Sequence, residues 1–248
     1  MSPYRAILFD LFGTVALLDR QKLPVFEWGG QTIHSTMAAL RTLYEQRAPG
    51  LPFTDFFAAL TDVTREVGEQ RAQGMREISS VQEFALILKR ASLADSLQTR
   101  RLAEELSLAH TASLAGATEI PPRNAIFLGK ACARYHVALV TNFDHGPTVR
   151  QVLDIGGVTE YFDRIVISDE HGWRKPHPRI FTDTLAALRV KPEEALFVGD
   201  SPRDDIAGAK NVGMDVAWIN AQGSALPGDV PTPDYTVRAI PELQPFLF

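Results

Sequence analysis

The first strongly patterned stretch of the chain is a short apolar run that ends at an acid. Residues 6–9 are all apolar, Asp10 follows them, and the chain turns at Gly13 and Thr14. An uninterrupted apolar run of this length is typical of a strand buried in a parallel sheet. Open α/β sheets place their active sites at the carboxyl ends of strands, where Asp10 is expected. An Asp before a Gly turn is also common turn chemistry, so this stretch alone leaves both roles open.

The next hundred residues change to a helical pattern. Apolar residues recur at helical spacing, and no strand-like run is evident. The sequence therefore predicts an all-helical insert of about four helices. The expected helices cover residues 33–47, 53–73, 79–91 and 95–114.

After Gly116 short apolar runs alternate with amphipathic segments. The expected strands are 137–140, 164–167, 195–198, 215–219 and an edge strand at 235–237, and the expected helices are 123–135, 147–155, 179–188 and 204–212. This alternation predicts an α/β fold with a doubly wound parallel sheet. We expect a Rossmann-like core formed by residues 1–14 and 115–248, with residues 15–114 as an inserted helical cap. Because the insert leaves the core after the first strand, it is expected above Asp10, where it can close on a substrate.

Composition limits the partners and the compartment. The 248 residues carry a net charge of −5 with both signs interspersed, so nothing favours nucleic acid or an anionic membrane as a partner. The single cysteine, Cys132, excludes a disulfide framework within one chain. No apolar run approaches the ~20 residues that span a bilayer, and no signal peptide is evident. We expect a cytoplasmic monomer or homodimer that acts on a small-molecule substrate.

Polar residues follow four of the expected strands. Asp10 and Thr14 follow the first, and Thr141 and Asn142 follow the second. Lys175 comes after the third strand, and Asp200 and Asp205 follow the fourth. Since parallel strands end at one edge of a sheet, these side chains are expected to converge there.

The chemistry of these residue types suggests a role for each. Asp10 is a candidate nucleophile, and Lys175 is a candidate positive charge beside it. Asp200 and Asp205 are candidate ligands of Mg²⁺, which prefers one or two carboxylates together with water and substrate oxygens. The Thr141 hydroxyl and the main-chain amide of Asn142 are candidates to bind substrate oxygens.

Each of these residues also has a purely structural interpretation. Lys175 suits a solvated loop, the acids after Asp200 suit a helix cap, and Thr141 with Asn142 suits a turn. Taken one at a time, these interpretations are at least as good as the functional ones. All four groups together, each at a strand end, favour a functional site.

In these four segments the chain resembles the haloacid dehalogenase superfamily of aspartate-nucleophile hydrolases. The matching residues are Asp10-Leu11-Phe12-Gly13-Thr14, Val140-Thr141-Asn142, Lys175-Pro176-His177-Pro178, and Gly199-Asp200-Ser201 with Asp205-Ile206-Ala207-Gly208-Ala209-Lys210. The helical insert resembles the cap that one branch of this family carries after its first motif. The resemblance implies Asp10 as the nucleophile, Lys175 as its charge partner and an acidic metal site near Asp200. It leaves open which of Asp204 and Asp205 serves the metal.

Phe12 departs from the phosphatases of this family. Those enzymes carry a second Asp at this position, which protonates the leaving group and later activates water. Phe12 has no proton to give, although its backbone carbonyl can still ligate a metal. Loss of such an acid typically costs about 10²–10⁴ in rate. Asp144 and His145, just past Asn142, are hypothetical replacements for it.

Two alternatives stay open beside a magnesium-dependent phosphohydrolase. The 2-haloacid dehalogenases of this family also have an aromatic residue at the position of Phe12, because halide leaves without a proton. In such an enzyme Arg41, on the first expected cap helix, would bind substrate. Dehalogenases of this type bind no metal, however, whereas Asp200 and Asp205 form the metal-binding version of the fourth motif. The second alternative is a non-catalytic relative that keeps the fold as a binding module.

Overall fold

The computed structural model describes residues 3–248 and divides into two compact units. The first unit contains Met1–Leu17 and Glu119–Phe248, and the second contains Leu18–Thr118. The chain passes between the units at β2 (Leu17–Leu18) and β5 (Thr118–Glu119), which pair with each other as a two-stranded sheet.

The first unit is built on a six-stranded sheet in the order β10-β9-β8-β1-β6-β7. All of its strand pairs are parallel, which confirms the predicted α/β fold class. The strands are β1 (Ala6–Phe9), β6 (His136–Thr141), β7 (Arg164–Ile167), β8 (Ala195–Gly199), β9 (Asp215–Ile219) and β10 (Tyr235–Val237). Because β1 lies between β6 and β8, Asp10 stands at the centre of the carboxyl edge.

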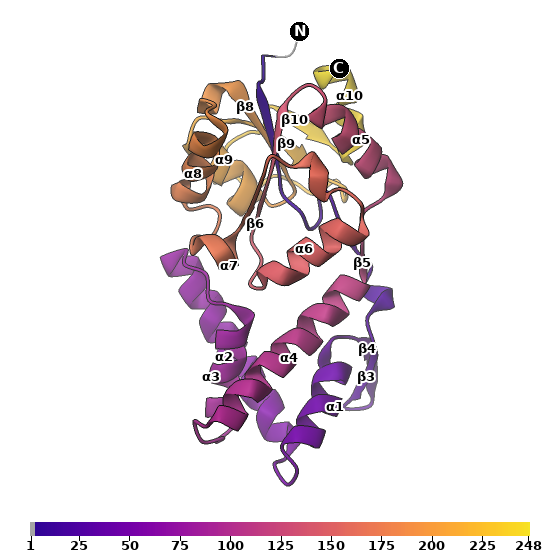
Figure 1. Ribbon diagram of the computed structural model, residues 1–248, viewed down its shortest axis with the longest axis vertical. Helices are drawn as coiled ribbons and strands as arrows, with labels where there is room; N and C mark the ends of the chain where they lie inside the picture. The colour runs from indigo at the N-terminus through magenta and orange to yellow at the C-terminus, as the bar shows by residue number, and fades with distance from the viewer. Residues whose placement is uncertain (1–2) are drawn as a thin grey trace. The chain divides into compact units, whose positions relative to one another are not determined.

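Helices cover both faces of this sheet. Figure 1 shows α8 and α9 on one side and α5 on the other. The helices of this unit are α5 (Pro122–Cys132), α6 (Gly146–Ile155), α7 (Ser168–His171), α8 (Pro178–Leu188), α9 (Ala207–Asn211) and α10 (Gln244–Leu247), with 3₁₀ turns at Thr159–Tyr161, Pro192–Glu194 and Ile240–Leu243.

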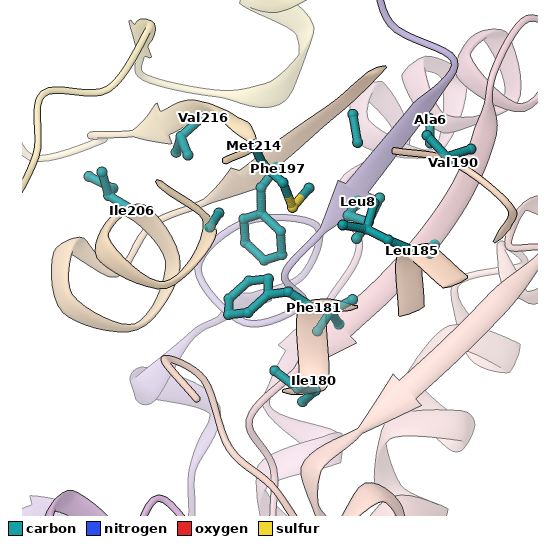
Figure 2. Close-up of a cluster of buried hydrophobic side chains, with 14 of the residues drawn as sticks. Ala6, Leu8, Ile180, Phe181, Leu185, Val190, Phe197, Ile206, Met214 and Val216 are labelled. Carbon is teal, nitrogen blue, oxygen red and sulfur yellow. The ribbon is translucent and has the colours of Figure 1, made fainter. Parts of the chain in front are cut away.

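Alternate residues of β1 pack into different layers. Leu8 is fully buried in the cluster that β8 and α8 also line, while Phe9 contacts Phe127 of α5. In that cluster the rings of Phe181 and Phe197 meet edge to face with centroids 5.2 Å apart (Figure 2). Such two-sided burial explains why the central strands read as unbroken apolar runs.

The helix expected at residues 204–212 is interrupted. Pro202–Ile206 forms a π-helical turn, and α9 begins only after it. The amides of Asp205 and Ile206 both bond to the Ser201 carbonyl, at 2.9 and 3.2 Å, which widens this turn. Such a turn often occurs at a functional site.

The second unit contains the four expected helices. They are α1 (Met37–Arg47), α2 (Phe53–Gly74), α3 (Ser80–Arg90) and α4 (Leu97–Gly116), and a 3₁₀ turn lies at Arg20–Lys22. Their shared core is aromatic and aliphatic, with Tyr44, Phe56 and Leu106 fully buried. Within residues 3–248, no helix has the length and apolar character needed to cross a membrane.

The expectation that the insert contains no strands is wrong. β3 (Val25–Trp28) and β4 (Gln31–His34) form an antiparallel hairpin, and the helix expected from residue 33 begins at Met37. Gly29 and Gly30 have φ values of +58° and +77°, which a two-residue type I′ turn requires. The Gly-Gly pair between two short segments that contain β-branched and aromatic residues is the signal that could have revealed this hairpin.

Candidate active site

Asp10 is held at the end of β1 by the backbone of its neighbours. Its amide donates to the Val198 carbonyl at 2.9 Å, and its side chain is buried. The chain then turns back, with the amides of Thr14 and Ala16 both donating to the Leu11 carbonyl. This turn presents the Asp10 carboxylate at the sheet edge.

Gly13 lets this turn approach Asp200 closely. Its φ is +82°, and a Cβ at this position would lie 2.3 Å from Asp200 Oδ2. A side chain at residue 13 would therefore both strain the backbone and displace the Asp200 carboxylate.

Gly13→Ala is expected to lower stability by more than the roughly 1–2 kcal/mol that a left-handed backbone costs an L-residue. Gly157→Ala is the matched control, because Gly157 has φ +64° and no described atom within 4 Å of its Cβ position. Thermal unfolding with and without Mg²⁺ separates the two effects. Only Gly13→Ala should also lose stabilisation by Mg²⁺, and identical behaviour of both variants would contradict this account.

Lys175 bridges two buried carboxylates. Its Nζ lies 2.6 Å from Asp10 Oδ1 and 2.7 Å from Asp205 Oδ1, and the lysine side chain is 2% exposed. Burial alone would lower the pKa of this ammonium, but the two carboxylates outweigh burial and raise its pKa above the usual range. The lysine is therefore a fixed positive charge against Asp10.

The Asn142 side chain clamps the backbone of Lys175. Asn142 Oδ1 accepts from the Lys175 amide at 2.8 Å, and Nδ2 donates to the Lys175 carbonyl at 2.9 Å. The loop between α7 and α8 is thereby fastened to the end of β6. The sequence suggested a main-chain contact from Asn142 to substrate, and it gave no indication of this clamp.

Asp205 and Asp200 differ in their partners. Asp205 is almost fully buried, and besides its contact with Lys175 it accepts from the Ser201 amide at 2.9 Å. Asp200 is only partly buried, and its backbone carbonyl accepts from Trp218 Nε1 at 3.0 Å. One oxygen from each of Asp10, Asp200 and Asp205 lies within 4.8 Å of the others.

These groups line a pocket of about 190 Å³ in the first unit. The walls consist of Asp10, Phe12, Thr141, Asn142, Arg174, Lys175, Asp200, Ser201, Asp204 and Asp205. Four carboxyl groups thus face two basic side chains, which leaves two formal negative charges in excess when all four carboxyls are ionised. Burial, with the nearby Asp10 carboxylate, raises the pKa of Asp200 to about 6, and burial also raises the pKa values of Asp204 and Asp205. Hard oxygen donors with this excess charge fit a divalent cation such as Mg²⁺.

Thr141 brings an unused hydroxyl to this pocket. Its Oγ1 is buried and has no hydrogen-bond partner among residues 3–248. A buried hydroxyl without a partner is costly, so it is suited to a ligand oxygen. Thr14, another candidate, is also buried, and its hydroxyl has no hydrogen-bond partner in the described part of the chain, but it is not among the residues that line the pocket.

The remaining candidates lie outside this pocket wall. Arg41, on α1 of the second unit, pairs with Glu45 at 2.8 Å and lies over the Phe53 ring. Asp144 and His145 are not pocket-lining residues, and His145 Nδ1 is 2.8 Å from Thr148 Oγ1.

The sequence assigned no role to Arg174 or to Ser201, which also line the pocket. Arg174 directly precedes Lys175, and Ser201 directly follows Asp200 within the fourth motif. Adjacency was the available signal, but only the loop conformation decides which neighbour faces the pocket.

Comparison with known proteins places the chain in a protein family. The family described as "haloacid dehalogenase-like hydrolase" matches residues 4–213. The chain belongs to this family. The prediction of an enzyme of the haloacid dehalogenase superfamily is therefore confirmed, while the assignment to its helical-cap branch stays a prediction.

The proteins that are similar to this hydrolase are named for different activities. Glyceraldehyde 3-phosphate phosphatase of Pyrococcus furiosus is 28% identical over 249 residues, which cover 100% of this chain and 93% of that protein. Phosphoserine phosphatase of Thermus thermophilus is 38% identical over 101 residues, 40% of each chain. The structure of a 2-haloacid dehalogenase from Pseudomonas syringae superposes with a TM-score of 0.74 at 24% identity over 98% of both chains, which shows a shared fold.

Proposed function

We propose that this hydrolase is a magnesium-dependent phosphatase of a small phosphorylated metabolite, with Asp10 as its covalent nucleophile. The observation that carries the proposal is the set of Asp10, Asp200 and Asp205 oxygens within 4.8 Å of one another beside a buried lysine. Two phosphatase-named relatives support it, one matched over the full length of this chain and one over 101 residues. A cytoplasmic location and a monomeric or homodimeric state stay predictions from the sequence.

Asp10, Asp200 and the Phe12 backbone carbonyl are the ligands that we assign to Mg²⁺. Asp205 already contacts Lys175 and the Ser201 amide, so we assign it to hold the lysine rather than the metal. Bound Mg²⁺ would neutralise charge on the phosphoryl group as it approaches the carboxylate.

The protein groups then divide the phosphoryl transfer among them. Asp10 Oδ attacks phosphorus, and the leaving oxygen departs with the electron pair of the broken P–O bond. Lys175 offsets the charge of the attacking carboxylate and the phosphoryl oxygens, and the Thr141 hydroxyl donates to one of those oxygens. Water then attacks the aspartyl phosphate, which releases phosphate and returns Asp10 as a carboxylate.

Dehalogenation is the second candidate, because Phe12 leaves the pocket without a proton donor at that position. The charge of the pocket opposes it. A 2-haloacid is itself a carboxylate, and without a cation it would enter a pocket with two negative charges in excess. The phosphatase is therefore the better-supported function.

The test is phosphate release from p-nitrophenyl phosphate and acetyl phosphate, with Mg²⁺ and with EDTA. We expect release that EDTA abolishes, and Asp200→Asn should lower it by about 10²-fold or more because a charged ligand is lost. Asp95→Asn, which changes an exposed acid of the second unit, should have no effect. EDTA-insensitive chloride release from 2-chloropropionate, without phosphate release, would instead establish the dehalogenase.

A further inference from the structure

Phe12 is the single apolar side chain among the described residues that line the pocket of Asp10. Its ring stacks on Phe143 with centroids 4.8 Å apart and an interplanar angle of 30°. Phe143 is itself anchored, because its amide donates to Ser168 Oγ at 2.9 Å and its carbonyl accepts from that hydroxyl at 3.2 Å. The pocket therefore has one rigid, aromatic, proton-free wall.

The polar groups of the pocket are poorly suited to give a proton to a leaving oxygen. Lys175 is enclosed between Asp10 and Asp205, and losing its proton would leave both carboxylates without their counter-charge. Arg174 holds its proton at all accessible pH values. Among the pocket acids that we assign to neither Mg²⁺ nor Lys175, Asp204 alone remains. Burial raises its pKa, while Lys175, Arg174 and Asn142 oppose that shift, so Asp204 is the one acid that could compete with solvent as a proton source.

We propose that the enzyme selects phosphate compounds whose leaving group departs as a stable anion, namely aryl and acyl phosphates, over alkyl phosphates. This inference rests on the phosphatase function proposed above. When Asp10 Oδ bonds to phosphorus, the P–O bond to the leaving group breaks and its electron pair stays on the leaving oxygen. A phenolate or carboxylate carries that charge without protonation and takes its proton later from solvent. An alkoxide does not, so its departure is slow beside Phe12.

The same wall also affects the second step. Water must attack the aspartyl phosphate without a base at position 12, and its proton passes to the released phosphate or to solvent. For good leaving groups this step becomes the slower one, so a burst of phenol should precede steady turnover. The selectivity is therefore read in kcat/KM, which reports the transition state of the step that breaks the leaving-group bond.

The experiment measures kcat/KM with Mg²⁺ for p-nitrophenyl, phenyl, acetyl, ethyl and glycerol phosphates. We expect log(kcat/KM) to fall steeply from the aryl and acyl compounds to the alkyl ones. Phe12→Asp should raise kcat/KM for the alkyl phosphates by about 10²-fold relative to p-nitrophenyl phosphate, since it supplies an acid. Phe12→Asn is the control, because asparagine has the shape of aspartate but no acidic proton, and it should not change that ratio.

Other outcomes would overturn the inference in distinguishable ways. Similar kcat/KM values for alkyl and aryl phosphates would leave the phosphatase function intact and remove the selectivity. The selectivity would also be refuted if the native enzyme showed a shallow dependence of log(kcat/KM) on the leaving group and Asp204→Asn made that dependence steep. Asp204 would then be the acid that protonates the leaving group. An absence of phosphate release from every compound overturns the inference and the proposed function together.

Discussion

Asp10→Asn is expected to abolish phosphate release, with a loss of kcat on the order of 10⁴–10⁶-fold. An amide at this position keeps the shape of the side chain but cannot form the aspartyl phosphate. The variant should stay folded, since one negative charge leaves a pocket that has two in excess. Acid quenching after incubation with a phosphorus-labelled aryl phosphate should trap label on the native chain and none on Asp10→Asn.

This variant also separates an enzyme from a binding module of the same fold. A module that only binds its ligand would show no turnover in the native chain and would bind phosphate equally well before and after the substitution. Asp229→Asn is a suitable control, because this exposed acid pairs with Arg203 away from the pocket wall. Label on both Asp10→Asn and the native chain would place the nucleophile at another residue.

The sheet was predictable because its strands are short, mostly apolar runs, and those of the central strands are buried on both faces. β1, β7 and β9 begin and end at the residues expected from the sequence, since each is an uninterrupted run of mostly apolar residues bounded by a turn. The strand order does not follow from such runs. The order is set by the parallel pairings of β1 with both β6 and β8. The alternation of strands and helices along the chain is compatible with these pairings but does not specify them.

The convergence of the site was predictable for the same reason. Parallel strands end at one edge, and the structure brings Asp10, Lys175 and Asp200 into one pocket. Pairing within the site was not predictable. From the sequence Asp205 is expected to bind metal with Asp200, and this stays a prediction. No signal in the sequence indicated its contact with Lys175, which it makes from within the π-helical turn Pro202–Ile206. The sequence cannot specify a turn whose geometry depends on its tertiary contacts.

The hairpin in the second unit was missed for a different reason. β3 and β4 are four residues each, and every residue of β4 is exposed, so no apolar period marks that strand. Its stability comes from Phe26, which is buried, and from Trp28, which packs against Phe57 of α2. The turn chemistry of Gly29 and Gly30 was a more informative signal than hydrophobic period here.

Lys175→Met is expected to lower the free energy of unfolding by about 3–5 kcal/mol, as removal of one partner does in a buried ion pair. The methionine fills a similar volume, but it leaves the Asp10 and Asp205 carboxylates buried without a counter-charge. At about 2–4 °C per kcal/mol for a domain of this size, the melting temperature should fall by about 6–20 °C. Phosphate release should be lost as well, since the attacking carboxylate loses its charge partner.

The pH dependence of that loss identifies its cause. Burial raises the pKa of Asp205 above its unfolded value even with Lys175 present, and removing the lysine raises it further. A carboxyl with a raised folded pKa contributes stability at low pH and loses it as pH rises, so the deficit of Lys175→Met should widen from about pH 4 upward. Lys210→Met is the matched control, because Lys210 also contacts two acids, Asp215 and Asp234, but is 21% exposed and should cost less.

Thermal unfolding of both lysine variants from pH 4 to pH 8, in EDTA, measures this difference. Adding Asp205→Asn to Lys175→Met should recover part of the lost stability, since one of the two uncompensated charges is removed. A deficit that is independent of pH and unchanged by Asp205→Asn would mean that the lysine contributes through packing alone. The packing of Lys175 over the Phe197 ring, with Nζ 5.2 Å from the ring centroid, would then be the stabilising contact. The electrostatic account of the site would have to be abandoned.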